Sequence, residues 1–236
     1  MHRLLVFTAK FVLVPLLTTA IPFLQFSLAQ NINVVKKIKI YQQQIKKDSN
    51  YLLIELKDSI PGIEYNLVYA TENNFTGTQL YKQANTTFAR LPVVKALQRV
   101  QNELQMKGYG LKVFDAYRPF AVTKKMWELI KDERYVANPA KGSGHNRGLA
   151  VDLTIIDLNT GKELYMGTGF DNFTDTAHHA FKALPAAILA NRNLLRQLME
   201  KHGFRALETE WWHYSWPNDR AYDVLDIDFK KLKALR

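Results

Sequence analysis

The sequence predicts an α+β fold, a single domain with a largely antiparallel central sheet flanked by helices. Amphipathic stretches at residues 91–108 and 184–203 indicate helices, whereas runs rich in β-branched and aromatic residues at 150–158 and 210–216 indicate strands. These stretches do not alternate as regular strand–helix–strand units, so a doubly wound parallel sheet is not expected. The sequence contains no internal repeat, which favours one globular domain over a repeat array.

The expected elements follow one another from residue 51 onward. The helix at 91–108 ends at Gly108, because glycine readily adopts the left-handed conformation that closes many helices. The helix at 184–203 is the longest and carries an apolar stripe that we expect to face the core. The other expected elements are a strand at 51–57, a strand at 111–117, a helix at 121–133, a turn at 161–163 leading into a short extended segment at 164–167, and a strand at 204–207.

Residues 1–29 have the organisation of a secretory signal. A basic start is followed by an apolar run at residues 11–24, and the small residues Ser27 and Ala29 precede the expected cleavage site after Ala29. The apolar run is shorter than the roughly 20 residues of a membrane span, and two prolines interrupt it. An uncleaved anchor is therefore the weaker alternative. The sequence predicts an exported protein, periplasmic or secreted, with no stable membrane span after cleavage.

Charge and cysteine content narrow the classes of partner. The net charge is +10, and it would fall to +8 after loss of the signal, which holds Arg3 and Lys10 and no acid. Many of the basic residues lie in residues 30–50, which we interpret as a polar basic tether or a solvated face. Without a nucleic-acid motif, this charge predicts only nonspecific attraction to anions and no specific nucleic-acid partner. The absence of cysteine excludes disulfides and a lipid-modified cysteine.

Three potential metal ligands lie in two segments of the chain. SGHNRGLAVDLT (143–154) contains His145 and Asp152, and ETEWWHYSW (208–216) contains His213. Two imidazoles and one carboxylate suit a catalytic zinc, which keeps a fourth position open for the water that becomes the nucleophile. A glycine turn between His145 and the following strand allows Asp152 to return to the same metal.

Glu210 supplies the second part of this pattern. It lies three residues before His213, so its carboxylate can reach the water and accept its proton without being a ligand. The neighbouring Trp211 and Trp212 are expected to wall the site with apolar surface and lower the local dielectric. Taken together, these residues predict a zinc hydrolase.

Six sequence blocks follow one another along the chain. They are YATENNFTG (69–77), GYGLKVFDAYRP (108–119), SGHNRGLAVDLT (143–154), MGTGFD (166–171), HHA (178–180) and GFRALETEWWHY (203–214). An isolated HxxxxxxD or ExxH pattern occurs often by chance, whereas six blocks in order do not. Together they resemble those of the D-alanyl-D-alanine dipeptidases, the group that includes the vancomycin-resistance dipeptidase. These belong to a wider clan of zinc D,D-peptidases that also holds D,D-carboxypeptidases.

The resemblance implies a role for each matching residue. His145, Asp152 and His213 would bind one Zn²⁺ per chain, and Glu210 would act as general base and then as the acid that protonates the leaving amine. Arg118 would hydrogen-bond the oxyanion, a task that suits a permanently charged guanidinium. A further group, Tyr69, Ser143 and Asp171, would hold the free ammonium of the substrate.

Ordinary structural roles compete with these assignments. Asp171 alone could cap a helical turn beginning at Asn172, and Ser143 could be a loop residue between glycines. Arg118 before a proline could be an exposed arginine in an extended segment. Of the other histidines, His202 fits the end of the last long helix, where a cation suits the helix dipole. The adjacent pair at 178 and 179 could be structural or could support the metal ligands.

The resemblance implies hydrolysis of D-alanyl-D-alanine, or of a similar short D,D-dipeptide, during turnover of cell-wall peptides. It places this zinc D,D-dipeptidase domain at residues 51–236. One rival is a D,D-carboxypeptidase or endopeptidase acting on longer peptidoglycan stems. Another is a noncatalytic, zinc-stabilised module that binds wall peptides. The proposed ammonium-binding group favours the dipeptidase, and Glu210 with Arg118 favours an enzyme. No feature of the sequence indicates an oligomeric state.

Overall fold

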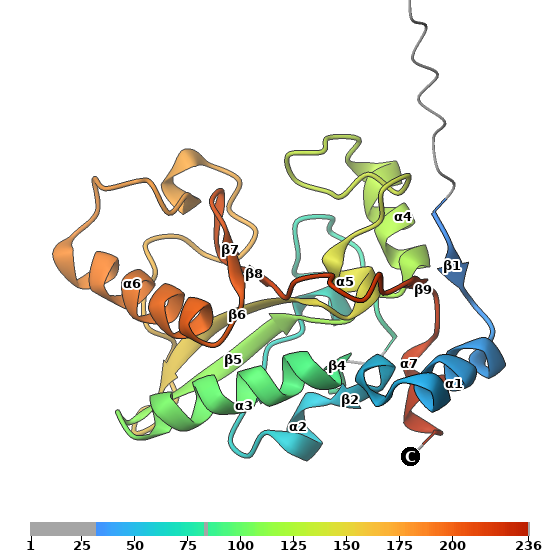
Figure 1. Cartoon of the computed structure of the whole chain (residues 1–236). Coiled ribbons are helices and arrows are strands. Elements are labelled where there is room, and N and C mark those ends of the chain that lie inside the picture. The colour runs from blue at the N-terminus through green and yellow to red at the C-terminus, as the bar shows by residue number, and fades with distance from the viewer. Residues whose placement is uncertain (1–31, 83–84, 236) are drawn as a thin grey trace, which may run out of the picture. The chain divides into compact units, whose positions relative to one another are not determined.

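Five strands form the central sheet of the computed structural model, which describes residues 32–82 and 85–235. Their order is β3-β5-β6-β8-β7 (Figure 1). β3 and β5 are parallel, and the other neighbours are antiparallel. The described residues belong to one compact unit, so the predicted α+β domain with a largely antiparallel sheet is confirmed. The strands are β3 (Glu64–Tyr65), β5 (Tyr109–Asp115), β6 (Ala150–Asp157), β7 (Arg205–Leu207) and β8 (Glu210–Ser215).

Two long helices pack against this sheet. α3 (Leu91–Gln105) contacts β5, α6 (Ala186–Lys201) contacts β7 and β8, and the helices also touch each other. Each helix buries one apolar stripe, as its periodicity predicts. Both predicted helices are confirmed with slightly earlier ends. The buried residues of the stripes include Val93, Leu97, Val100 and Leu104 in α3 and Ile188, Leu195, Leu198 and Met199 in α6.

The other elements are short and frame the ends of the sheet. β2 pairs with β4 in an antiparallel ladder, and β1 pairs with β9 in parallel. The bounds are β1 (Val34–Val35), α1 (Ile38–Lys47), β2 (Leu53–Glu55), α2 (Leu56–Ser59), β4 (Phe88–Arg90), α4 (Phe120–Leu129), α5 (Gly144–Arg147), β9 (Val224–Leu225) and α7 (Phe229–Lys233), with 3₁₀ helices η1 (Ser49–Tyr51), η2 (Val68–Ala70) and η3 (Asp175–Ala177).

Two segments differ from the sequence prediction. The strand expected at 51–57 is the shorter β2, which lies outside the central sheet and leads directly into α2. The extended segment expected at 164–167 is not a strand. Only Glu163 forms a bridge, with Ile156, and Gly167 at φ +89° then turns the chain. Glycine adopts this backbone conformation without the steric penalty of other residues.

The segment expected as a tether contains regular structure. The predicted signal peptide, residues 1–29, lies outside the described residues, but residues 34–47 of the predicted tether include β1 and α1. Tyr41 is fully buried, and its hydroxyl accepts a hydrogen bond of 2.6 Å from the backbone N–H of Leu53. Ile38 and Ile45, one turn before and after Tyr41, pack on the same cluster. This apolar stripe orders the segment, and its lysines remain on the solvated side.

Within residues 32–82 and 85–235, no helix has the length and apolar character required to cross a membrane.

We predict that Tyr41→Ala lowers the free energy of unfolding by about 3 kcal/mol or more, because it leaves a cavity and removes the partner of the Leu53 N–H. Urea denaturation of the purified variants measures the effect. The exposed Gln43 on the same helix provides the control, and Gln43→Ala should change stability little. A silent Tyr41→Ala would favour the tether interpretation.

Candidate metallopeptidase active site

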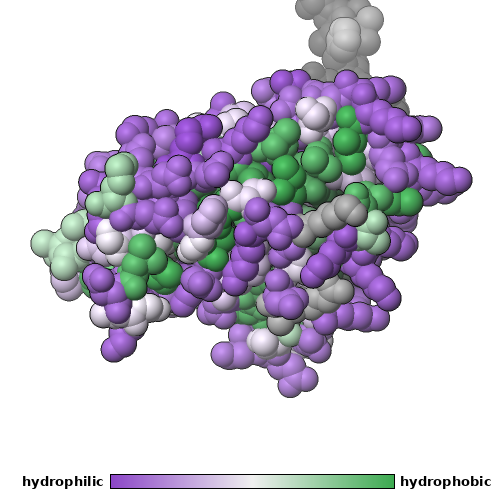
Figure 2. Space-filling view, turned by 90° about the horizontal axis from the view of Figure 1, so that it is seen from below, coloured by the Kyte–Doolittle hydropathy of each residue, from purple (hydrophilic) through white to green (hydrophobic). Residues whose placement is uncertain are grey.

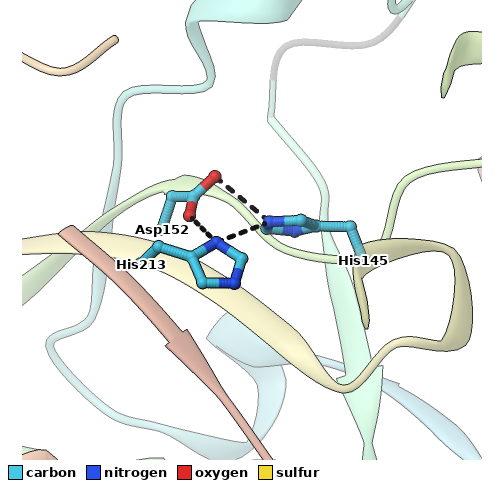
Figure 3. A group of neighbouring side chains, drawn as sticks. All are labelled: His145, Asp152 and His213. Atoms are coloured by element: carbon cyan, nitrogen blue, oxygen red, sulfur yellow. Dashed lines mark hydrogen bonds and ion pairs between the residues drawn. The ribbon is translucent and has the colours of Figure 1, made fainter. Parts of the chain in front are cut away.

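Three elements bring the predicted metal ligands together. His145 lies in α5, Asp152 in β6 and His213 in β8, and the last two face each other in the antiparallel register (Figure 3). His145 Nε2 is 3.3 Å from His213 Nδ1 and 3.3 Å from Asp152 Oδ2. His213 Nδ1 is 2.9 Å from Asp152 Oδ1. The ligand atoms lie within 4.8 Å of one another, so they can share one ion.

The single turn of α5 is fixed by its two ends. Ser143 Oγ accepts hydrogen bonds from the N–H groups of His145 and Asn146, and the side chain of Asn146 accepts one from the N–H of Ser143. This capping box satisfies donors that would otherwise be unpaired. Gly148 ends the turn at φ +70°, where a Cβ atom would lie 2.5 Å from a methyl carbon of Leu53. The predicted turn is confirmed, and it aims His145 at the sheet.

The distances between these atoms fit a tetrahedral metal site. Ligands about 2.0–2.1 Å from a zinc ion are separated by about 3.3 Å at tetrahedral angles. His145 Nδ1 lies 2.8 Å from the carbonyl oxygen of Ala116, which leaves Nε2 as the atom available to a metal. Burial alone would raise the pKa of Asp152, but His145 and His213 hold it below its usual range. Asp152 is therefore the anionic member of the ligand set.

Glu210 begins β8 and is largely buried beside the metal ligands. Its Oε2 lies 4.0 Å from His213 Nδ1, close to the metal site but outside the ligand group. Burial raises the pKa of Glu210 to about 7, and the charge of Asp152 adds to the shift. A carboxyl group with this pKa can take up and release a proton near neutral pH.

Asp115 connects Arg118 to the metal site. Its Oδ2 accepts hydrogen bonds from Arg118 Nε (2.9 Å) and Nη2 (2.7 Å), and its Oδ1 accepts one from the hydroxyl of Tyr81 (2.8 Å). The same Oδ2 lies 3.7 Å from His145 Nδ1. Arg118 is buried, in contrast to the exposed arginine considered as an alternative. Asp115 and Tyr81 were not identified from the sequence, although an acid at the end of an apolar strand signals a buried partner.

Asp171 and Tyr69 form a second polar pair in the same cavity. The Tyr69 hydroxyl lies 3.1 and 3.0 Å from the two carboxylate oxygens of Asp171. Burial raises the pKa of Asp171 well above its usual range, and the charge of Asp152 adds to the shift. Asp171 also has φ +57°, a conformation that costs energy for a non-glycine residue and often marks a functional position. Its side chain is directed to Tyr69 and caps no helix.

All eight predicted site residues line one cavity of about 250 Å³. Three aromatic side chains from loops, Phe75, Tyr135 and Phe173, also line it. The ring of Phe173 lies 5.3 Å from that of Phe75 and 4.4 Å from that of Tyr135. The sequence analysis did not identify these three partly buried side chains, because aromatic residues in loops have no periodic signal. Trp212 lines the cavity as expected, whereas the indole N–H of Trp211 donates to Thr168.

Three other histidines lie in the described part of the chain, and none of them belongs to the ligand group. His202 ends α6 and pairs with Glu103 at 2.7 Å, as its predicted structural role requires. His179 is buried against Tyr214, and burial lowers its pKa to about 4. His178 lies 3.8 Å from Asp175 on the surface side.

Comparison with known proteins places the chain among peptidases. A family model described as D-ala-D-ala dipeptidase matches residues 49–231. The chain is similar to D-alanyl-D-alanine dipeptidases of Escherichia coli K12 (35% identity, 75% of this chain and 91% of that protein) and Enterococcus faecalis V583 (33% identity, 67% and 88%). Among solved structures, an LdcB LD-carboxypeptidase matches at 21% identity with a TM-score of 0.40, covering 72% of this chain and 70% of its own.

We expect His145→Ala and His213→Ala to abolish metal retention, because each removes one of three protein ligands. Elemental analysis after dialysis should find about one divalent metal ion per wild-type chain and only background metal in the variants. His202→Ala is the matched control, since His202 binds a surface glutamate, and it should retain the metal. Full occupancy in either ligand variant would exclude that residue from the site.

Proposed function

Because this chain belongs to the family of D-alanyl-D-alanine dipeptidases, we propose that it hydrolyses D-alanyl-D-alanine or a similar short D,D-dipeptide with the help of zinc. The observation that carries the proposal is the convergence of the ligand triad, Glu210, Arg118 and the Tyr69–Asp171 pair on one small cavity. A metal site, a proton-transfer group, an oxyanion donor and an ammonium acceptor are the parts that such a reaction requires.

We assign zinc to His145, Asp152 and His213 from their chemistry and spacing. Two imidazole nitrogens and one carboxylate oxygen, about a tetrahedral edge apart, are typical of catalytic zinc sites. Zinc bound there supplies Lewis acidity toward a water and a carbonyl. The Ala116 carbonyl supports the assignment by holding His145 in one ring orientation.

Glu210 moves the protons. Its carboxylate, with a pKa raised by burial to about 7, takes a proton from the attacking water and later gives one to the leaving amino group. Glu210 Oε2 lies 4.0 Å from His213 Nδ1, outside the ligand group, so its carboxylate is within reach of a water bound at the metal site. Both proton transfers therefore pass through one carboxylate.

Arg118 binds the oxyanion. Two of its nitrogens, Nε and Nη2, are fixed by Asp115, and we assign the remaining Nη1 as the donor to the developing charge. Because Asp115 and Tyr81 hold the guanidinium in advance, little reorganisation is needed in the transition state.

Asp171, Tyr69 and Ser143 receive the free amino terminus. A buried carboxylate with a raised pKa is costly to ionise alone, and a substrate ammonium would compensate its charge. Tyr69 holds this carboxylate in position. Ser143 Oγ accepts backbone N–H bonds from His145 and Asn146 as a helix cap. Its role at the amino terminus rests on its position in the cavity wall.

We also propose that the protein is exported and acts on wall peptides outside the cytoplasm. The support is the signal-like organisation of residues 1–29, with a basic start, an apolar run and a small-residue cleavage site.

Glu210→Gln should retain the metal and lose hydrolysis, because the amide preserves shape but cannot accept a proton. The expected fall in kcat is about 10²- to 10⁴-fold, and metal analysis of the same sample separates chemistry from metal loss. Glu208→Gln, an exposed glutamate two residues away, is the control and should leave turnover unchanged. Wild-type turnover of Glu210→Gln would reject the assignment.

Acetylation of the amino group of D-Ala-D-Ala should prevent the dipeptide from binding at Asp171. Acetyl-D-Ala-D-Ala lacks the ammonium and would leave Asp171 unpaired, so kcat/KM should fall by about 100-fold or more relative to D-Ala-D-Ala. Asp171→Asn should lose activity on the free dipeptide, whereas Asp175→Asn on the surface should not. If acetyl-D-Ala-D-Ala or a wall pentapeptide is cleaved as rapidly as the free dipeptide, the carboxypeptidase alternative replaces the dipeptidase.

A further inference from the structure

Lysines gather on two helices remote in sequence from the catalytic residues. The segment from residue 36 to residue 47, which contains α1, has no acidic residue, and neither does α7. The lysines are all exposed, and within the described part of the chain none of them forms an ion pair. They are Lys36, Lys37, Lys39, Lys46 and Lys47 around α1, and Lys230, Lys231 and Lys233 in α7.

The acids close to these lysines already have other partners. Asp48 pairs with Arg220, Asp223 accepts hydrogen bonds from Asn33 and Gln44, and Asp228 caps α7. Elsewhere on the surface, ion pairs such as Lys201–Glu103 and Lys112–Glu163 offset part of the charge. The field of the lysine group is therefore only partly compensated, and it favours an anionic partner.

The two helices meet at an apolar hollow. Tyr41 of α1 belongs to the same buried cluster as Phe229 and Leu232 of α7. The strand before α1, β1, pairs with β9, the strand before α7. The hollow measures about 310 Å³ and is lined by Gln42, Ile45, Lys46, Leu52 and Leu235. Leu235 is 36% exposed, and Ile40 on α1 is 43% exposed. In the view from below, apolar patches lie between hydrophilic side chains on the side of the molecule where α1 and α7 lie (Figures 1 and 2).

This surface is separate from the catalytic parts of the chain. None of the lysines lines the catalytic cavity. α1 also lies before the region matched by the family model, residues 49–231. The E. coli relative is covered over 91% of its own length by 177 residues of this chain. The chemistry common to the family therefore does not account for the lysines of α1.

We propose that α1 and α7 form a docking face for the surface of an anionic phospholipid bilayer. The lysines match the negative headgroups, and the hollow with Ile40 and Leu235 accepts apolar parts of the lipid. The apolar component favours a bilayer over a hydrophilic polyanion, which has nothing to place in the hollow. Docking would hold the enzyme at the membrane surface.

Flotation of the chain without its predicted signal, residues 30–236, with lipid vesicles tests the proposal, because the described fold belongs to this part alone. Binding should be strong to vesicles containing phosphatidylglycerol, weak to pure phosphatidylcholine, and reduced by salt. The quadruple variant Lys39→Gln, Lys46→Gln, Lys47→Gln, Lys233→Gln should bind at least about tenfold less. The matched control Lys95→Gln, Lys107→Gln, Lys125→Gln, Lys131→Gln removes the same charge from exposed positions elsewhere and should bind like the wild type.

Leu235→Gln distinguishes the bilayer from a soluble polyanion. It should weaken vesicle binding and leave binding to poly-L-glutamate unchanged. None of these residues lines the catalytic cavity, so turnover of D-Ala-D-Ala, together with circular dichroism, verifies that each variant is folded. Three results would overturn the proposal: equal binding to neutral and anionic vesicles, equal losses in the two quadruple variants, or preference for poly-L-glutamate without any effect of Leu235→Gln.

Discussion

The register of β5, β6 and β8 is the constraint on which the site depends. Asp152 in the middle strand faces Asp115 on one side and His213 on the other, so three functional side chains form one row across the sheet. A shift of one residue would turn a strand's side chains to the opposite face. Because β5 and β6 are buried along most of their length, their apolar residues fix this register. The packing of the core thus sets the spacing of the metal ligands.

The helix that completes the ligand set is held differently. α5 is a single turn and has no intrinsic stability of its own. Its capping box, the left-handed Gly148 and the contact of His145 Nδ1 with Ala116 fix it against the sheet. Asp115 then links this arrangement to Arg118, so His145 and the proposed oxyanion donor share one buried support. A change at Asp115 would therefore affect both.

Residues with a local signal could be predicted from the sequence, whereas residues defined by a distant partner could not. Periodicity predicted α3 and α6, and residue type and spacing with a glycine turn predicted that His145, Asp152 and His213 lie together, as they do in the structure. Asp115 and Tyr81 gained their meaning only from the pairing of segments far apart in the chain. The helix α1 was missed for another reason. Its apolar stripe is short and most of its residues are polar, so composition indicated a solvated segment while Tyr41 anchors it in the core.

The balance of charge in the cavity connects the metal to the substrate. Four buried or largely buried carboxyl groups, Asp115, Asp152, Asp171 and Glu210, lie around the cavity that also holds the buried guanidinium of Arg118. Arg118 is already paired with Asp115, and His145 and His213 lower the pKa of Asp152, so Asp171 and Glu210 are the acids left to be compensated. Burial and the charge of Asp152 raise the pKa of both. A divalent cation beside Asp152 and an ammonium beside Asp171 would each offset negative charge where it is most costly. The same electrostatic imbalance therefore favours both a metal ion and a substrate that carries a free amino group.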